Sequence, residues 1–278
     1  MSRNQPHPQK SSNSSDFVSQ VLSSRKYRSL GIPESTVNDL IWQAQKSGVA
    51  SKELEKTVRQ KMHKLVAPYL GDVNYEAVSA QLDEAFAAHS EEEIRQVCTL
   101  ILSAHASTKE RLSILTEFYA AIFAETGQPG SILDLACGLN PFSIPWMNLS
   151  KETRYYAYDI IQPRVDLINH FLQSSQMSPL AEVRDILVDP PTVQADLAFF
   201  FKEAHRFDQR QKGCNRAFWI SIPAKILLVS LPTSNLAGTH PKLDQHRRLV
   251  YDTLEGLAWS VRELLFENEI VFIIRKIP

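Results

Sequence analysis

The first part of the chain has a helical hydrophobic pattern. Between Phe17 and about His105, apolar positions recur every three or four residues, and strand-like alternation is nearly absent. The segment Ser51–Leu65 shows this most clearly, because its apolar residues recur at spacings of four, four and three. One buried stripe is therefore expected on this helix, made by Leu54, Val58, Met62 and Leu65. Pro68 and Gly71 end the predicted helix.

Two further helices are expected after this segment, at about Asn74–Ala88 and Glu91–Ser103. With them, residues 16–105 form a predicted N-terminal helical domain. Residues 1–15 are polar and rich in Ser, Asn, Gln and Pro, a composition typical of a disordered tail. The same residues lack the apolar stretch of a signal peptide, so a cytoplasmic protein is expected.

The remaining chain, residues 106–278, alternates between short apolar runs and amphipathic segments. Ser107–Glu110 has the spacing of a capping box, and a helix is expected from there through Phe123. Buried strands are predicted at Ser131–Ala136, Arg154–Asp159, Ala181–Ile186, Asp196–Phe201 and Lys225–Leu231. Further helices are predicted at Asn140–Leu149, Pro163–Leu172 and Leu243–Trp259. The closing apolar runs, Val261–Phe266 and Glu269–Arg275, are expected to pair antiparallel.

This alternation of strands and helices predicts an α/β fold with a mostly parallel, doubly wound sheet. The antiparallel pair at its end distinguishes the sheet from a standard dinucleotide-binding fold. Ligands of such sheets bind outside the carboxyl ends of the strands, at the point where the strand order reverses. The residues that follow the first strands are therefore the first candidates for a site.

Composition narrows the class of protein further. The 278 residues are 44% hydrophobic and 22% charged, an ordinary globular balance. No apolar run approaches the roughly 20 residues that a membrane span requires. The three cysteines, Cys98, Cys137 and Cys214, form no CxxC pair, which argues against a disulfide framework and a structural zinc site. No metal is therefore expected.

The charges are unevenly distributed, although the formal net charge is only −1. Residues 1–70 hold 11 Lys and Arg against 5 Asp and Glu, whereas residues 71–110 hold 2 against 8. On the helix Ser51–Leu65, four basic residues share a face separate from the apolar stripe: Lys52, Lys56, Arg59 and His63. Such residues are either a solvated helix face or a surface that docks on nucleic acid. Charge alone favours the solvated face.

The loop after the first predicted strand carries the clearest chemical signal. This loop, within Asp134–Phe142, contains Ala136 and Gly138, small residues that let the backbone approach a ligand closely. Its single glycine does not make the GxGxxG phosphate fingerprint. Asp134 suits a cationic amino-acid group and repels a pyrophosphate, while Asp159 ends the second strand, where it can hold two ribose hydroxyls. These residues favour S-adenosylmethionine over NAD; the alternative is an ordinary capped strand-to-helix turn.

Several stretches between residues 23 and 276 match the motifs of one protein family, in the family's order. The two most specific are Asp-Leu-Ala-Cys-Gly-Leu-Asn-Pro at 134–141 and Thr-Lys-Glu-Arg at 108–111. The others are Ser23–Arg28, the basic helix Glu53–Leu65, Tyr158–Ile160, Asp196–Lys202, Ser230–Thr233 and Phe266–Glu269. Together they resemble the aminoglycoside-resistance 16S rRNA methyltransferases, which methylate N7 of guanine 1405.

This resemblance implies a class I (Rossmann-like) methyltransferase fold with a mostly parallel seven-stranded sheet, preceded by a helical extension that docks on the small ribosomal subunit. It implies S-adenosylmethionine as the cofactor and 16S rRNA in the 30S subunit as the substrate, with aminoglycoside resistance as the consequence. A monomeric enzyme is expected.

The resemblance also assigns roles at the cofactor site. Arg111 resembles the arginine that pairs with the cofactor's carboxylate, and Asp185 lies where class I enzymes place an acidic residue near the adenine amino group. A buried structural pair is nearly as plausible for Asp185. The expected cofactor-binding residues are Arg111, Asp134, Ala136, Gly138, Asp159, Ile160, Asp185 and Ile186. Lys202 and Asp185 are expected to position the target; for Lys202 the alternative is a side chain that reaches water. No catalytic residue is assigned.

The expected RNA-binding residues are Arg25, Lys26, Tyr27, Lys52, Lys56, Arg59, His63 and Lys64. The sequence departs from the family at Ser234, where members usually carry Arg or Lys, and at Gly238–Lys242, which holds fewer charges than usual. Three functions stay open: the N7-guanine methyltransferase, a methyltransferase of small molecules, and a ribosome-binding relative without activity. The basic extension argues against the second, and Ser234 keeps the third open.

Overall fold

The computed structural model describes residues 12–67, 72–234 and 242–276. The chain divides into two compact units, residues 1–70 and residues 71–278. Most of the predicted tail, residues 1–15, lies outside the described residues, and helix α1 (Ser12–Leu22) already begins within it.

The boundary between the units differs from the one predicted between residues 105 and 106. Helices α4 (Tyr75–Ala87) and α5 (Glu91–Leu102) form as predicted, but they belong to the second unit. There α4 packs against α8 (Gln162–Ser174) and α5 against the 3-10 helix η3 (Asn140–Trp146). A helical pattern shows that a stripe will be buried, but it does not show which partner buries it.

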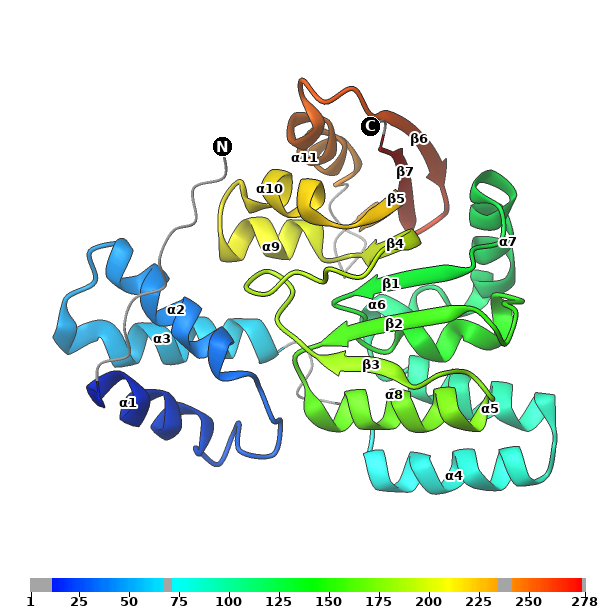
Figure 1. The fold of residues 1–278 in the computed structure, drawn as a ribbon, viewed down its shortest axis with the longest axis horizontal. Coiled ribbons are helices and arrows are strands. Elements are labelled where there is room, and N and C mark those ends of the chain that lie inside the picture. Colours follow the sequence, from blue (N-terminus) through cyan, green and yellow to red (C-terminus); the bar gives the residue numbers. More distant parts are fainter. Residues whose placement is uncertain (1–11, 68–71, 235–241, 277–278) are drawn as a thin grey trace. The chain divides into compact units, whose positions relative to one another are not determined.

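The N-terminal unit consists of α1, α2 (Glu34–Lys46) and α3 (Ser51–Val66), shown in blue to cyan in Figure 1. Helix α2 packs against both α1 and α3. Val58 and Met62 of α3 are fully buried, and Leu54 and Leu65 are half-buried. The apolar stripe predicted from the spacing is therefore confirmed.

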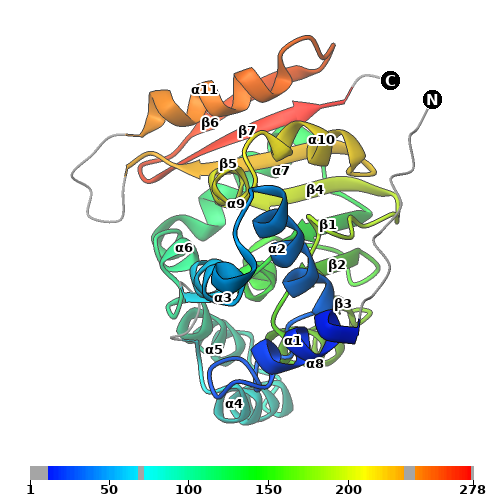
Figure 2. The same ribbon diagram turned by 90° about the vertical axis from the view of Figure 1, so that its left-hand side faces the viewer.

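The second unit is built on a seven-stranded sheet of order β3-β2-β1-β4-β5-β7-β6, which can be followed from bottom to top in Figure 2. The strands are β1 (Ser131–Leu135), β2 (Arg154–Asp159), β3 (Leu180–Val183), β4 (Ala195–Phe201), β5 (Ala224–Pro232), β6 (Ser260–Leu265) and β7 (Glu269–Arg275). Strands β1 to β5 are parallel, whereas β7 runs antiparallel to both β5 and β6. The predicted topology is confirmed, including the antiparallel end.

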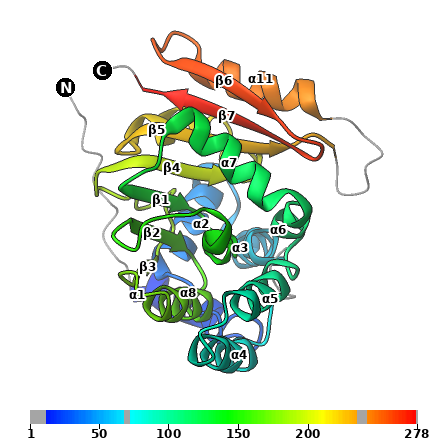
Figure 3. The same cartoon turned by 90° about the vertical axis from the view of Figure 1, so that its right-hand side faces the viewer.

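Helices cover both faces of the sheet because its central strands, such as β1 and β4, bury apolar side chains on both sides. In β4, Leu197 and Phe199 pack with α4, α5, η3, α7 (Leu115–Thr126) and α8. The alternate residues Ala198 and Phe200 pack with α9 (Ala204–Arg210), α10 (Cys214–Ser221) and α11 (Leu243–Leu254). Figure 3 shows α5 and α7 along one side of the strands. The two layers leave the strand ends as the places where polar side chains can gather.

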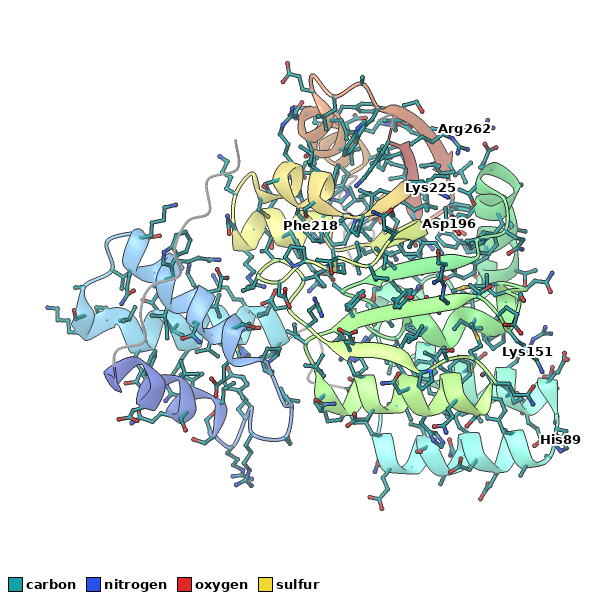
Figure 4. The ribbon with its side chains drawn as sticks, in the orientation of Figure 1. His89, Lys151, Asp196, Phe218, Lys225 and Arg262 are labelled. Atoms are coloured by element: carbon teal, nitrogen blue, oxygen red, sulfur yellow. The ribbon has the colours of Figure 1, made fainter. Side chains whose placement is uncertain are left out.

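At the amino edge of the sheet, Asp196 holds three strands together (Figure 4). Its carboxylate accepts hydrogen bonds from the Gly130 amide at 3.1 Å, from Ser131 Oγ at 3.2 Å and from Lys225 Nζ at 2.8 Å. The hydrogen bond from Lys225 lowers the pKa of Asp196, and the positive charge of Lys225 lowers it further by a smaller amount. This edge is thus fixed by structural contacts, and the opposite edge carries the candidate site.

The local structure before β1 differs from the prediction. Instead of a capping box and one helix, the chain forms a short helix α6 (Ala106–Lys109), a 3-10 turn η2 (Leu112–Ile114) and then α7. Ser107, the expected capping residue, lies inside α6, and Thr108 Oγ1 donates to the Leu102 and His105 carbonyls. Helices α9 and α10 were not predicted. Within the described ranges, no helix has the length and apolar character needed to cross a membrane.

Candidate active site

The carboxyl ends of β1, β2 and β4 bring the predicted site residues of the second unit together. Strand β1 lies between β2 and β4, so the strand order reverses beside it, where open parallel sheets bind ligands. Asp134 lies near the end of β1, Asp159 ends β2, and Lys202 follows β4. All three side chains are buried.

Asp134 is a buried carboxylate held by neutral hydrogen-bond donors. Its Oδ2 accepts from Tyr155 Oη at 2.6 Å and from Asn140 Nδ2 at 3.0 Å. Burial raises the pKa of Asp134 to about 7, against the lowering effect of the Tyr155 and Asn140 hydrogen bonds. A cationic group placed beside this carboxylate would remove the cost of its burial. Asp134 therefore suits an ammonium ligand, as predicted for the amino-acid end of the cofactor.

Arg111 lies in the same network on the other side of Asn140. Its Nη1 donates to Asn140 Oδ1 at 2.9 Å, while Nε and Nη2 donate to the two carboxylate oxygens of Glu269 at 3.1 and 2.5 Å. The guanidinium also lies 4.3 Å from the ring centroid of Phe118 and 4.9 Å from that of Phe201. Within the described part of the chain, these bonds use three of the five N–H groups of the guanidinium.

The loop between β1 and η3 has an unusual backbone. Ala136 and Gly138 both lie in the left-handed region, with φ of 52° and 54°. This conformation costs glycine little but is strained for alanine, by roughly 1–3 kcal/mol. The Gly138 amide donates to Asp159 Oδ2 at 3.1 Å, so the carboxylate at the end of β2 holds the loop in place. Small residues at these positions therefore serve a sharply turned loop at the expected cofactor site.

Asp159 makes more protein contacts than its predicted role as a ribose clamp suggests. Besides Gly138, it accepts from the Ile161 amide at 2.9 Å and from Arg164 Nη1 at 3.0 and 2.9 Å. A carboxylate has about four acceptor positions, so these donors fill them. A ribose hydroxyl can bind Asp159 only by replacing or sharing one of them. Ile160 lies between these contacts, directly after β2.

Asp185, in the loop after β3, is buried and forms a bidentate ion pair with Arg210 of α9. The two distances are 2.9 and 2.8 Å, and the Leu187 amide donates to the same carboxylate at 3.3 Å. The paired carboxylate that was the alternative for Asp185 is thus present in the structure. Ile186 is buried beside it. Arg210 was not predicted, since no motif connects it with Asp185 in the sequence.

Lys202 is buried at the end of β4, with a left-handed φ of 59°. Its Nζ donates to Glu110 Oε2 at 2.7 Å and lies 3.4 Å from Glu269 Oε2. Burial raises the pKa of Glu269, but the charges of Arg111 and Lys202 lower it below its usual value. Glu110 and Glu269 belong to matched motifs, yet the sequence assigned neither a role.

In the N-terminal unit, most predicted RNA-binding residues are exposed. They include Arg25, Lys26, Lys52, Lys56, His63 and Lys64, and Arg59 is partly exposed. Lys26 Nζ lies 2.6 Å from His63 Nδ1, so the segment before α2 and the basic face of α3 form one surface. We call these seven residues the basic surface. Arg59 also pairs with Glu55 one turn away, at 2.9 Å.

Tyr27 does not belong to the basic surface. Its side chain is buried, and burial raises the pKa of its hydroxyl, with an opposing effect of the Arg59 charge. The ring therefore packs inside the N-terminal unit instead of facing a solvent-exposed nucleic acid. Tyr27 was expected to bind RNA together with Arg25 and Lys26, but the tertiary structure places its ring in the core.

The residues of this site fit S-adenosylmethionine at its amino-acid end. That end carries an ammonium and a carboxylate. The site offers the buried carboxyl group of Asp134 for the ammonium and the buried guanidinium of Arg111 for the carboxylate. Asn140 joins the two by donating to one and accepting from the other. No group of three or more potential metal ligands occurs among the described residues.

The fold and this arrangement define a class I methyltransferase. The family model "Ribosomal RNA methyltransferase (FmrO)" matches residues 23–273, and the chain belongs to this family. The enzyme class and the S-adenosylmethionine cofactor predicted from the sequence agree with this family.

Similar proteins carry consistent names. A 16S rRNA (guanine(1405)-N(7))-methyltransferase from Micromonospora echinospora is 29% identical over 94% of this chain and 96% of its own length. One from Serratia marcescens is 31% identical over 81% of this chain and 83% of its own length. The solved structure of the 16S rRNA methylase RmtB matches with a TM-score of 0.75 and 25% identity, covering 96% of this chain and all of RmtB.

Proposed function

We propose that this protein transfers a methyl group from S-adenosylmethionine to N7 of guanine 1405 in the 16S rRNA of the 30S subunit, which gives aminoglycoside resistance. The observation that carries the proposal is the buried network Asp134–Asn140–Arg111, which fits the amino-acid end of the cofactor inside a family match over residues 23–273. We further infer that the enzyme works as a monomer in the cytoplasm and without a metal.

The chemistry places few demands on proton transfer. Guanine N7 has a lone pair in the plane of the base and carries no proton, so its methylation requires no general base. The bound cofactor supplies an electrophilic methyl group on a sulfonium. The protein then acts mainly by positioning, because holding two reactants at near-attack distance lowers the barrier substantially.

Individual residues divide this positioning between them. Asp134 and Arg111 hold the amino-acid end of the cofactor. Asp159 shapes the loop at Gly138, where the small residues Ala136 and Gly138 allow close approach of the cofactor. Lys202, held between Glu110 and Glu269, orients the guanine or an adjacent phosphate. Asp185, fixed by Arg210, borders the adenine together with Ile186, and Ile160 lies on the ribose side.

The basic surface of the N-terminal unit docks on the subunit. In A-form RNA, N7 faces a deep, narrow groove that side chains hardly enter, so the target base has to leave the helix. Extrusion costs a few kcal/mol, and phosphate contacts from the basic surface offset this cost. The departure at Ser234 affects a second RNA-side segment, most of which (residues 235–241) lies outside the described residues. Weaker docking than in relatives is expected from it.

Primer extension on 16S rRNA tests the proposal directly. After incubation of 30S subunits with the protein and S-adenosylmethionine, reduction and aniline treatment cleave the strand at an N7-methylguanine. A stop at guanine 1405 that requires the cofactor is expected. Asp134→Asn should abolish the stop, while the matched exposed variant Asp83→Asn should retain it. A folded preparation that binds S-adenosylmethionine but methylates a different nucleotide, or none, contradicts the proposal.

A further inference from the structure

Two histidines from different helices lie together beyond the carboxyl ends of β4 and β5. The rings of His205 in α9 and His246 in α11 have centroids 5.6 Å apart, and their planes are inclined by 38°. His205 follows Lys202 by three residues. His246 Nδ1 lies 2.8 Å from the carbonyl oxygen of Pro232, the last residue of β5. Since β5 pairs with β4, the two imidazoles lie at the strand end next to the lysine that is expected to position the target.

The protein satisfies the hydrogen-bonding groups of this histidine pair only in part. A carbonyl oxygen can only accept, so Nδ1 of the buried His246 carries the hydrogen of its bond to Pro232. In the neutral ring, Nε2 of His246 is then an acceptor. Nδ1 of His205 is a buried atom with no hydrogen-bond partner among the described residues. Native proteins pair nearly all of their buried polar atoms, so this atom indicates a site for a group that the chain itself does not supply.

The charges that act on the pair are cationic. Burial lowers the pKa of His205 to about 3, and the charges of Arg206, His246 and Lys242 act in the same direction. Burial also lowers the pKa of His246, and the Lys242 charge adds to this effect against the backbone hydrogen bond. Arg206 lies 3.6 Å from Glu203 at the start of α9, whereas Lys242 is half-buried and enters no ion pair within the described ranges. Both histidines are therefore mainly neutral at pH 7, and the group that this cluster lacks is an anion.

We propose that His205, His246 and Lys242 bind a backbone phosphate of the RNA strand beside the target guanine. The inference rests on the proposed function. A nucleotide that leaves its helix carries its flanking phosphates with it, so a base held beside Lys202 brings an anion to the neighbouring strand end. Contacts to phosphate fix the register of a nucleic acid on a protein, which is the role assigned to these three side chains.

Phosphate binding at this site should take up protons. The oxygens of a phosphodiester only accept hydrogen bonds, so Nε2 of His246 has to be protonated before it can donate to one. A bound anion raises the imidazole pKa that burial and the nearby cations lower in the unbound protein. Affinity for the 30S subunit should therefore increase as the pH falls, by up to about tenfold per pH unit for each proton taken up. A guanine edge bound at the same place would use Nε2 as an acceptor, and affinity would then decrease as the pH falls.

Binding of 30S subunits between pH 6 and pH 8 tests the inference. In the test variant, His205→Phe with His246→Asn, phenylalanine keeps a ring of similar size and asparagine keeps a donor for the Pro232 carbonyl. This variant should bind about tenfold more weakly than the wild type at pH 6 and lose most of the pH dependence. Lys242→Met should weaken binding and lower the slope of log affinity against log salt by about one.

The matched control is His89→Asn with Lys151→Met, which removes an exposed imidazole and an exposed ammonium from the same unit (Figure 4). It should bind subunits like the wild type at every pH. Stability separates docking from a role in the core. His205→Phe alone removes a buried nitrogen without a partner, so it should retain or increase stability in urea unfolding while it weakens docking. This single variant replaces the double variant if the double variant does not fold.

The outcomes separate this inference from the proposed function. Wild-type docking by the histidine variants at pH 6, or a wild type whose affinity decreases as the pH falls, overturns the inference. If the wild type still methylates guanine 1405, the proposed function stays intact. A loss of docking by His205→Phe that follows an equal loss of stability assigns the ring to the core and also overturns the inference. A wild type that neither binds nor methylates 30S subunits defeats both.

Discussion

Arg111 and Glu269 lie 158 residues apart in the chain, yet they form a bidentate ion pair in which each side chain is only 2% exposed. The pair joins the segment before α7 to the first residue of β7, so the antiparallel end of the sheet contributes to the candidate site. Glu269 also lies 3.4 Å from Lys202 Nζ. One carboxylate thus orients both the expected cofactor-binding arginine and the expected target-positioning lysine.

Glu269→Gln should destabilise the protein strongly. The substitution leaves Arg111 buried without its anionic partner, and breaking a buried pair in this way costs about 3 kcal/mol or more. Urea unfolding monitored by circular dichroism measures the change, and calorimetry with S-adenosylhomocysteine should show weaker binding. The control Glu267→Gln changes an exposed carboxylate two residues away and should alter stability by less than about 0.5 kcal/mol. Equal stability of the two variants would contradict the structural role of Glu269.

Asp134 should make stability depend on pH. Its pKa of about 7 in the folded protein lies above the ordinary value of 3.8, so the folded state holds a proton that the unfolded chain has lost. The resulting contribution favours folding at low pH and is lost as the pH rises through about 7. Asp134→Asn stays neutral throughout. The stability of the wild type relative to this variant should therefore fall between pH 5 and pH 8 in urea titrations, and a constant difference would refute the raised pKa.

Lys202 should affect methylation more than cofactor binding. Lys202→Met leaves Glu110 and Glu269 in place but removes the ammonium that orients the target, and misplacement by about 1 Å can cost on the order of 100-fold in rate. Single-turnover methylation of 30S subunits at saturating cofactor should slow by about that factor. The exposed Lys212→Met serves as the control and should react like the wild type. If Lys202→Met lowers only the affinity for S-adenosylhomocysteine, its role lies in the cofactor site.

The basic surface should determine docking. Lys56→Glu combined with Arg59→Glu should weaken 30S binding and flatten its salt dependence, since fewer counterions are released. Affinity for S-adenosylhomocysteine in the absence of subunits should not change, because the expected cofactor-binding residues all belong to the second unit. Binding is measured at several salt concentrations by filter retention.

A matched control for this charge reversal comes from the second unit. Lys151 and Arg262 are exposed there (Figure 4), and Lys151→Glu with Arg262→Glu introduces the same change in net charge. The double variant Lys151→Glu with Arg262→Glu should bind subunits more tightly than Lys56→Glu with Arg59→Glu at every salt concentration. Equal losses would mean that only total charge matters, and wild-type binding by Lys56→Glu with Arg59→Glu would refute the docking role.

Much of the architecture could be predicted because it is encoded locally. The apolar stripe of α3 follows from residue spacing, and the alternation of strands and helices predicted the parallel sheet with its antiparallel end. The residues at the ends of β1 and β2 could be predicted as candidate site residues because this topology places ligands there. Asp134 and Gly138 do lie at that position, next to Asp159.

The class of fold, the family and the kind of chemistry could be established from the sequence, because hydrophobic period and short motifs are properties of neighbouring residues. Three features became visible only in the folded protein: α4 and α5 belong with the sheet, Tyr27 is core, and Asp185 pairs with Arg210. In the folded protein Arg111 also meets Glu269, and Arg164 lies between Asp72 and Asp159. Each of these contacts joins segments that come together only when the whole unit packs. The spacing of residues along the chain therefore cannot predict which distant charge will pair with a buried side chain.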